Sequence, residues 1–544
     1  MKSLHPSLLL TNSQATNSKN TTPALSPLAK AIRLSVLGLG LAHCAANAAT
    51  INVTTNLDND FGCTLREAIL SINNGSVGST GCNSSGFFGN NDSITFNSGL
   101  DPTITLESGA LVINNDVSID ASNISTGIIR TGITVNGNNS SRVFEIENAT
   151  VSMNRMTITG GTSGGGRGGG IAASNSTVSL SNSTVSNNQA NNYAGGIYAV
   201  VSTVIISNST VSGNSAGSGG GGIYAFISTV SLSNTTVSGN QADEFGGGIA
   251  AVDASTVSLS NSTVSGNSAE FGAGIAASNS STVSLSNSTV SGNSAESGGG
   301  IYARRSSNVS LSNSTVSGNS ALYIGGGIIA NGSTVSLSNS IVSGNSVGYG
   351  GGGIFASNSS TVSLSNSTVS GNSTNFRGGG IFAYNSTVSL SNSTVSGNSA
   401  NFYGGIFAIS TSTVSLSNSI VANSLGGDCA YISSATNINI DTATIIEDGS
   451  CGAERSGDPG LLPLADNGGE TLTHALSPTS ISLNSGIFSG AAAGFENCTS
   501  EDQRGEARDN GDGACDVGAF EANVQTTNFF VIPLSDGRAV VIPL

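Results

Sequence analysis

The sequence has few charged residues, few aromatic residues and no tryptophan. Charged residues make up 9% of its 544 residues, compared with about 25% in ordinary soluble domains. Lysine and arginine number 16 against 32 acidic residues. Because nucleic acids and anionic membranes are bound by clustered cations, this balance argues against both as partners. The hydrophobic content of 37% is too high for a disordered chain.

Glycine is present in excess, with 74 copies, and much of it belongs to an internal repeat. From Gly170 to Asn423 a Gly-Ile step recurs about every 26 residues, and a Ser-Asn-Ser marker such as that at Asn182 keeps pace with it. The isoleucines of the repeat are Ile171, Ile197, Ile223, Ile249, Ile275, Ile301, Ile328, Ile354, Ile381 and Ile406.

Within each unit, apolar residues alternate with serine or threonine, as around Val178, Leu180 and Val185. A period of two is typical of strands with one buried face. A unit with three short strands and Gly or Asn corners predicts one coil of a right-handed parallel β-helix, an all-β solenoid. Stacked coils bury together the apolar face that a single coil exposes. We expect the corner asparagines to bond to one another between coils.

Residues 1–48 have the features of a signal peptide. An apolar run over 34–46 follows Lys30 and Arg33, and Ala46-Asn47-Ala48 supplies a small-x-small cleavage pattern. The run is too short for a transmembrane helix. In an exported chain, an even number of cysteines favours disulfides. With Cys44 in the leader, the other six form three neighbouring pairs: Cys63 with Cys82, Cys429 with Cys451, and Cys498 with Cys515.

Residues 60–73 predict a short helix that caps the first coil, because Thr64 and Glu67 have the spacing of a capping box. Its apolar face would consist of Leu65, Ala68, Ile69 and Ile72. The stretch Cys63-Thr-Leu-Arg-Glu-Ala68 resembles the Cys-Ser-Leu-Arg-Glu-Ala (CSLREA) element that opens many bacterial β-helix surface proteins.

Two further resemblances cover most of the remaining chain. The repeats are similar to those of chlamydial polymorphic outer-membrane proteins, with Val211-x-x-Asn214 in place of their Phe-x-x-Asn. The stretches 458–476, 502–505 and 515–521 resemble the choice-of-anchor domain of exported bacterial proteins. These resemblances imply an exported protein at the cell surface, in the outer membrane or outside the cell, with an adhesin-like role and no agreed reaction.

The predicted organisation therefore has five parts. They are a signal peptide over 1–48, an N-terminal cap and first coils over 49–150, regular β-helix repeats over 151–425, a small β-rich choice-of-anchor-like domain over 426–522, and a hairpin tail about Asp536-Gly537 over 523–544.

Two outward-facing columns are candidate binding surfaces. A threonine column should stack beside a serine column on one face, and an aromatic column follows the isoleucines. If the isoleucines point inward, the aromatic side chains point outward, where they would stack on sugar rings or bind a partner, or else pack as a ladder between coils or against a covering loop. The threonines are Thr177, Thr203, Thr229, Thr256, Thr282, Thr334, Thr361, Thr387 and Thr413, and the aromatic residues are Tyr198, Tyr224, Tyr302, Phe355, Phe382 and Phe407.

Charged side chains are rare in the repeats. Glu244, Glu270 and Glu296 occupy equivalent positions in three coils, where they would be solvated or bridged by a cation. An Asp253/Glu270 pair, with Arg304 or Arg305 nearby, is the combination that an enzyme would use.

The main functional hypothesis is a surface adhesin or structural spacer without catalysis. Its partners would be surface glycans or host or matrix proteins, bound through the exposed aromatic or Thr/Ser columns. No catalytic, cofactor-binding or metal residues are predicted, and no cofactor. The first alternative is a polysaccharide lyase or glycosidase on a β-helix scaffold, and the second is an ice-binding protein that orders water on its Thr/Ser array.

Overall fold

The computed structural model describes residues 48–543 apart from 60–61, 127–128, 488–489, 491, 493–494, 509–513, 523–528 and 534–538. Residues 47–544 form one compact unit, to which all the elements below belong. The predicted signal peptide, residues 1–48, lies outside the described residues except for Ala48.

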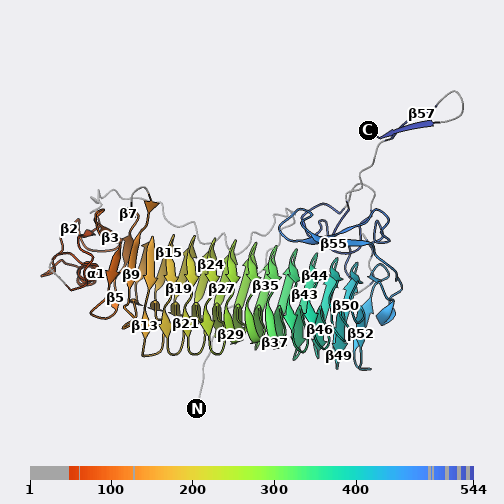
Figure 1. Ribbon diagram of the computed structural model, residues 1–544, viewed down its shortest axis with the longest axis horizontal. Helices are drawn as coiled ribbons and strands as arrows, with labels where there is room; N and C mark the ends of the chain where they lie inside the picture. Colours follow the sequence, from red (N-terminus) through yellow and green to blue (C-terminus); the bar gives the residue numbers. More distant parts are fainter. Residues whose placement is uncertain are drawn as a thin grey trace, which may run out of the picture. The chain divides into compact units, whose positions relative to one another are not determined.

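The repeats form a right-handed parallel β-helix, in which each regular coil gives one strand to each of four sheets (Figure 1). One such coil consists of β14 (Ile171–Ser174), β15 (Thr177–Ser181), β16 (Thr184–Ser186) and β17 (Gln189–Ala190), in sheets 1 to 4 respectively. Sheet 1 has 13 strands from β5 (Leu111–Ile113) to β52 (Cys429–Tyr431), sheet 2 has 16 from β2 (Ser84–Ser85) to β53 (Asn437–Ile440), sheet 3 has 14 from β4 (Thr103–Thr105) to β54 (Ile445–Ile446), and sheet 4 has 9 from β13 (Thr162–Ser163) to β45 (Ser373–Thr374).

The prediction of three strands per coil was wrong by one. The fourth strand is short, as in β21 (Ser215–Ala216), and a two-residue strand shows no periodicity in the sequence. The pairing register is regular: Ile171 pairs with Ile197, Thr177 with Thr203, and the coils that follow keep the same register. Identical side chains therefore form columns along the stack, and the inward Ile, Val and Leu columns form a continuous buried core.

The buried polar groups of the coils are satisfied by an asparagine ladder inside the stack. Each amide nitrogen donates to the amide oxygen of the next coil at 2.9–3.0 Å, as Asn293 does to Asn319. It also donates to a valine carbonyl of the coil before, as Asn293 does to Val264 at 3.1 Å. The ladder consists of Asn188, Asn214, Asn240, Asn267, Asn293, Asn319, Asn345, Asn372 and Asn398.

The other asparagine column, that of the Ser-Asn-Ser marker, has a different role from the one expected. Asn182 and its equivalents adopt a left-handed backbone conformation, with φ near 50° at Asn182 and Asn208. Asparagine tolerates this conformation better than most residues, which explains its recurrence at the turn between sheets 2 and 3. Few of these side chains bond to one another, whereas the neighbouring serines do link the coils: the Ser183 amide, for example, donates to the Ser209 hydroxyl at 3.0 Å.

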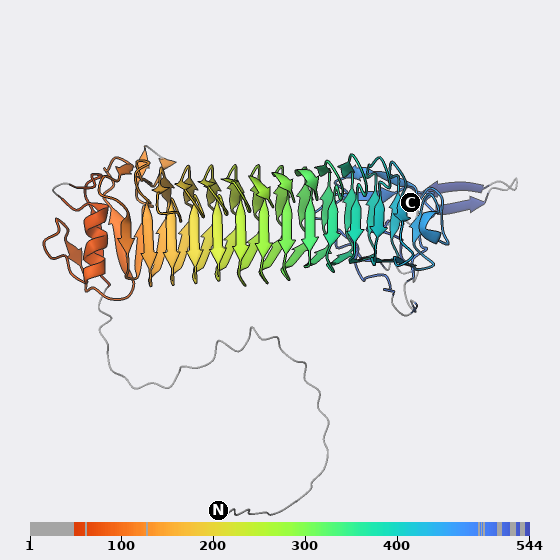
Figure 2. The same ribbon diagram turned by 90° about the horizontal axis from the view of Figure 1, so that it is seen from below.

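The first coil is capped by α1 (Leu65–Asn74), as predicted (Figure 2). Thr64 accepts a hydrogen bond from the Glu67 amide, and the Glu67 carboxylate accepts one from the Thr64 amide, so the capping box is present. The predicted apolar face of the helix is buried against the first strands. Arg66 pairs with buried Asp58 at 2.9 Å and donates to the Gly109 and Ala110 carbonyls.

All three predicted disulfides are confirmed: Cys63–Cys82, Cys429–Cys451 and Cys498–Cys515. The stack continues beyond residue 425 to β54, and β55 (Leu461–Ala465) then pairs with β56 (Thr473–Leu476). Near the C-terminus, β57 (Phe529–Pro533) pairs antiparallel with β58 (Ala539–Pro543), while the predicted turn at Asp536-Gly537 lies outside the described residues. Among the described residues, no helix has the length and apolar character to cross a membrane.

The asparagine ladder should control the stability of the stack. Asn293→Ala would leave the Asn267 backbone amide and one N–H of its side-chain amide without partners in the core, and it would remove the side-chain donor to the Val264 carbonyl. We expect the free energy of unfolding to fall by about 3 kcal/mol, measured by chemical denaturation. Ser258→Ala, on the outer face of sheet 2, is the control and should change it by less than about 0.5 kcal/mol. Equal effects of the two substitutions would contradict this role of the ladder.

Candidate binding surfaces

The outward face of sheet 2 carries the predicted threonine and serine columns. Thr177, Ser179 and Ser181 of β15 point outward and are half-buried, and the same positions repeat in register through the later coils. Asn308 replaces threonine in β35 (Asn308–Ser312), and Ile205 replaces serine in β19 (Thr203–Ser207). Some neighbouring hydroxyls bond to each other between coils, as Ser389 does to Ser363 at 3.2 Å. The predicted Thr/Ser face is therefore present.

This face is hollowed into a groove that we call the trough, the outward surface of sheet 2 from Ile205 to Ser415. One section has a volume of about 490 Å³ and runs from Ile205 to Ser310, and a second of about 620 Å³ runs from Ser310 to Ser417. Both sections include Ser310 and Ser312, so the trough is continuous over eight or more coils. Its walls carry serine hydroxyls and little charge.

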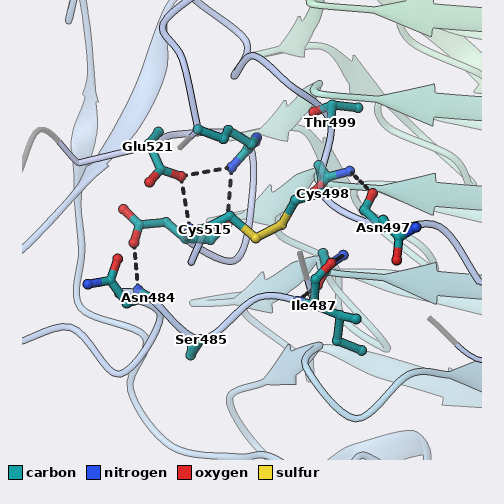
Figure 3. The surroundings of a disulfide bond; sticks show 12 residues. Asn484, Ser485, Ile487, Asn497, Cys498, Thr499, Cys515 and Glu521 are labelled. Carbon is teal, nitrogen blue, oxygen red and sulfur yellow. Dashed lines mark hydrogen bonds and ion pairs between the residues drawn. A yellow bond between two sulfur atoms is a disulfide. The ribbon is translucent and has the colours of Figure 1, made fainter. Parts of the chain in front are cut away.

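The second section is bounded by Glu496, Asn497 and Thr499. These residues belong to the C-terminal segment, by which we mean the described residues of 458–522. This segment is fixed to the turn asparagines of three coils. Asn418 donates to the Glu496 carbonyl at 3.1 Å, Asn392 to the Asn497 carbonyl at 3.3 Å, and Thr499 donates to the Asn366 side chain at 2.8 Å. Within the segment, the Cys498–Cys515 disulfide joins the residues of this wall to the stretch that ends in Glu521 (Figure 3). No pattern in the sequence indicated this wall of the trough, because its contacts join residues more than 70 positions apart.

The aromatic column is not exposed, which corrects the expectation of an outward aromatic surface. Tyr198, Tyr224, Phe382 and Phe407 are buried, and Tyr302 and Phe355 are half-buried. The structure shows the packing alternative: neighbouring rings of the column contact each other between coils, as Tyr198 does with Tyr224 at 5.7 Å, and a loop covers them.

The cover is formed by the glycine-rich loop between sheets 4 and 1, which folds back over the outer face of sheet 1. Gly220 illustrates the need for glycine: its φ is +67°, and a Cβ there would lie 2.7 Å from the Cβ of Tyr224. Tyr193 and Phe245 pack over the Tyr224 ring with centroids 4.5 and 6.3 Å away. Burial raises the pKa of the Tyr198 and Tyr224 phenols.

The glutamates of the predicted column do lie in neighbouring coils. The Ala269–Ala295 pairing of β29 (Ser268–Phe271) with β33 (Ser294–Ser297) puts Glu270 beside Glu296, and Phe271 donates to the Glu244 carbonyl. Glu244 and Glu296 are exposed and Glu270 is half-buried. Within the described ranges, no cluster of three or more acidic, histidine or cysteine side chains has the geometry to hold a metal ion.

Asp253 and Glu270 do not form a pair. Asp253 lies at the turn between sheets 1 and 2, where Asn279 donates to its carboxylate at 2.6 Å. Glu270 lies on sheet 4, and the whole of β30 (Ile275–Ser278) separates it from Asn279. Arg304 stacks on Phe245 and Tyr302, and Arg305 lies near Asn279. The residues considered for catalysis are thus distributed over different sides of the coil.

The C-terminal segment also covers sheet 3 in the last coils. Gln503 accepts a hydrogen bond from Thr368 at 2.6 Å, and the Ala519 amide donates to Thr394 at 3.0 Å. His474 lies between a coil and the segment: its Nδ1 donates to the Leu462 carbonyl at 2.7 Å, so its Nε2 accepts from the Ser370 hydroxyl at 2.8 Å. Burial lowers the pKa of this imidazole.

A buried charge network holds this segment together. Arg508 is fully buried and donates to the Gly518 carbonyl at 2.6 Å and the Asp516 carbonyl at 3.0 Å. Its guanidinium lies 3.4 Å from the Glu521 carboxylate. Burial, with Asp516 and Asp502 nearby, raises the pKa of Glu521 to about 8. These groups face the interior of the segment and are structural.

Comparison with known proteins agrees with this architecture. Residues 169–342 match the family model described as right-handed beta helix region. The repeat is a right-handed β-helix. Among solved structures, the chain is similar to pectate lyase Pel9A, with 13% identity, a TM-score of 0.31, and coverage of 88% of this chain and 97% of that one. It is also similar to PfbA, a surface adhesin of Streptococcus pneumoniae, with 10% identity, a TM-score of 0.28, and coverage of 76% and 95%. No curated protein matches the sequence.

The contact through His474 should make docking of the C-terminal segment depend on pH. Since burial lowers the pKa of His474 from its usual value of 6.5, the unfolded chain takes up a proton that the folded chain does not once the pH falls below 6.5. The contribution of buried, neutral His474 to the free energy of unfolding is therefore complete above pH 6.5, and it decreases as the pH falls toward the pKa of His474 in the folded chain.

The test compares the wild type with His474→Gln by chemical denaturation between about pH 8 and about pH 5. The wild type should lose its advantage over the variant as the pH falls. Glu521 titrates with the opposite sign, but it is present in both proteins and cancels in the difference. A difference that does not change with pH would contradict the role of His474.

Proposed function

We propose that this chain is an exported cell-surface protein that binds an extended carbohydrate polymer along the trough without cleaving it. The observation that carries the proposal is the trough itself, a continuous groove in which each coil presents the same hydroxyls. The three disulfides are typical of proteins that fold outside the cytosol. The resemblance to bacterial surface proteins agrees with this location.

The repeat geometry favours a polymeric ligand. Coils stack at the strand spacing of about 4.8 Å, so the trough presents a regular series of donors and acceptors. A polymer with hydroxyls along its length can bond to several coils at once, and weak individual contacts then add to a useful affinity. A wall at one end, through Asn497 and Thr499, limits where such a chain can lie.

We propose binding without catalysis because the acidic side chains that a glycosidase would need do not lie together in the trough. Glu496 is the one acidic residue that lines the two sections of the trough. Glycosidases use two carboxylates on either side of the bond that they cleave. Asp253 and Glu270 are separated by a strand of sheet 1 and lie on other sides of the coil from the trough.

The proposal is tested on arrays of surface and matrix glycans and matrix proteins. Ser363→Tyr and Ser389→Tyr would fill the trough, and we expect them to weaken glycan binding by about tenfold or more. Ser212→Tyr, the same change on the open outer face of sheet 3, is the matched control and should bind as the wild type does. Chain-length analysis of the bound polymer should show no shortening.

Three outcomes would contradict the proposal. Binding that survives in both trough variants would place the ligand elsewhere, and shortened products would indicate an enzyme. An array on which the wild type binds no glycan would leave the β-helix as a structural spacer.

A further inference from the structure

A row of aromatic side chains, three of them exposed and one half-buried, lies on another side of the β-helix, in the coils of β37 (Ser320–Ile324) to β49 (Ile406–Ile409). We call it the aromatic ridge, and it consists of Tyr323, Tyr349, Phe376 and Phe402. Tyr323, Tyr349 and Phe402 are 54%, 56% and 51% exposed. These residues lie in sheet 4 or in the loop that leads from it to sheet 1. They are distinct from the buried aromatic column, which belongs to sheet 1.

The backbone places these rings in successive coils. The Tyr349 amide donates to the Tyr323 carbonyl, and the Phe402 amide to the Phe376 carbonyl, both at 3.0 Å. The rings of Tyr349 and Phe376 have centroids 4.8 Å apart, and those of Phe376 and Phe402 are 6.0 Å apart. The ridge is thus a short row of aromatic rings in successive coils, tilted between Tyr349 and Phe376 and edge-to-face between Phe376 and Phe402.

Arg377 lies within this ridge. Its guanidinium lies over the rings of Phe376, Phe407 and Phe402, at 4.5, 5.5 and 6.0 Å from their centroids. The Nε atom is buried without a hydrogen-bond partner. In the part of the chain that the structure describes, the Arg377 side chain makes no hydrogen bond or ion pair. A guanidinium has five donors and binds carboxylates through a planar pair of them.

The sequence around Arg377 has no counter-charge. Between Arg305 and Asp428 it is the one charged residue of the chain. Of the other stacked arginines, Arg167 interacts with the Tyr198 phenol, and Arg304 lies over Phe245, the residue that follows Glu244 in the sequence. The chain has a net charge of −16, so an unpaired positive charge beside exposed rings is unusual in this protein.

We propose that the aromatic ridge and Arg377 form a binding site for an acidic carbohydrate, with sugar rings on the faces of Tyr349 and Phe402 and a uronate carboxylate on the Arg377 guanidinium. Aromatic faces attract the C–H groups of a flat sugar ring, and the unpaired guanidinium supplies the charge complementarity. A polymer of uronate units repeats both groups along its length, which matches a ladder of rings with a cation in it. The site lies two sheets along the coil from the trough, so it goes beyond the function proposed above.

The experiment measures binding of the full chain to alginate oligomers, which carry a carboxylate on each sugar, and to the same oligomers after methyl esterification. We expect the wild type to prefer the charged oligomers. Arg377→Gln should weaken binding to them by about tenfold or more and leave binding to the ester unchanged. The pair Tyr349→Ala and Phe402→Ala should weaken binding to both forms, because the rings contact the sugar and not its charge.

Matched variants separate this site from general effects. Arg305→Gln removes the same charge at an exposed turn, and Tyr384→Ala removes an exposed ring outside the ridge; both should bind alginate as the wild type does. If Arg377→Gln fails to fold, the exposed ring variants and Arg377→Lys, which keeps the charge, still test the site.

The proposal is overturned if the wild type does not bind alginate, or if Arg305→Gln weakens binding as much as Arg377→Gln. It is also overturned if dextran sulfate or poly-glutamate binds the ridge more tightly than alginate, since the ligand would then be a sulfate or an acidic peptide. Loss of alginate binding in the trough variants alone would assign the polymer to the trough instead. Normal binding of neutral glycans by Arg377→Gln would show that the function proposed for the trough is independent.

Discussion

The hydrogen bonds between asparagine side chains of neighbouring coils are the interaction on which the rest of the structure depends. A parallel β-helix must turn its backbone several times per coil, and each inward turn leaves polar groups in a dry interior. In this protein one asparagine per coil satisfies the backbone and the amide of its neighbour at once. Because the donor and acceptor lie in different coils, the residue has to be the same in every coil, 26 or 27 residues from its neighbour in the ladder.

That constraint explains the composition. A side chain is free to vary only where it faces solvent or a covering loop, so variation is concentrated outside the core columns. Serine is tolerated on the outer face of sheet 2, and small or aromatic residues follow the isoleucines where glycine loops fold back. Charges occur at turns and loop tips, as at Asp253 and Glu244, because the interior cannot hold them.

The C-terminal segment changes two faces of an otherwise uniform stack. It covers sheet 3 of the last coils through Gln503 and His474, and it adds a wall to the trough through Asn497 and Thr499. A regular solenoid by itself offers the same surface at each coil. The segment gives the trough a wall in the last coils, and the loops with Leu322-Tyr323 and Asn375-Phe376-Arg377 give the ridge its place.

The sequence determined the coil length, the inward columns, the capping helix with Thr64 and Glu67, and the disulfide pairs, because each depends on local spacing or on a register that repeats. It did not determine which outward columns stay exposed. Tyr198, in the column that follows the isoleucines, is buried under a loop, whereas Tyr323, which precedes the glycines of such a loop, is exposed. The positions of Asp253 and Glu270 within the repeat already indicated different sides of the coil. The wall at Asn497 and the isolation of Arg377 were decided by tertiary structure alone, since contacts between segments distant in sequence, and the path of each loop, leave no periodic signal.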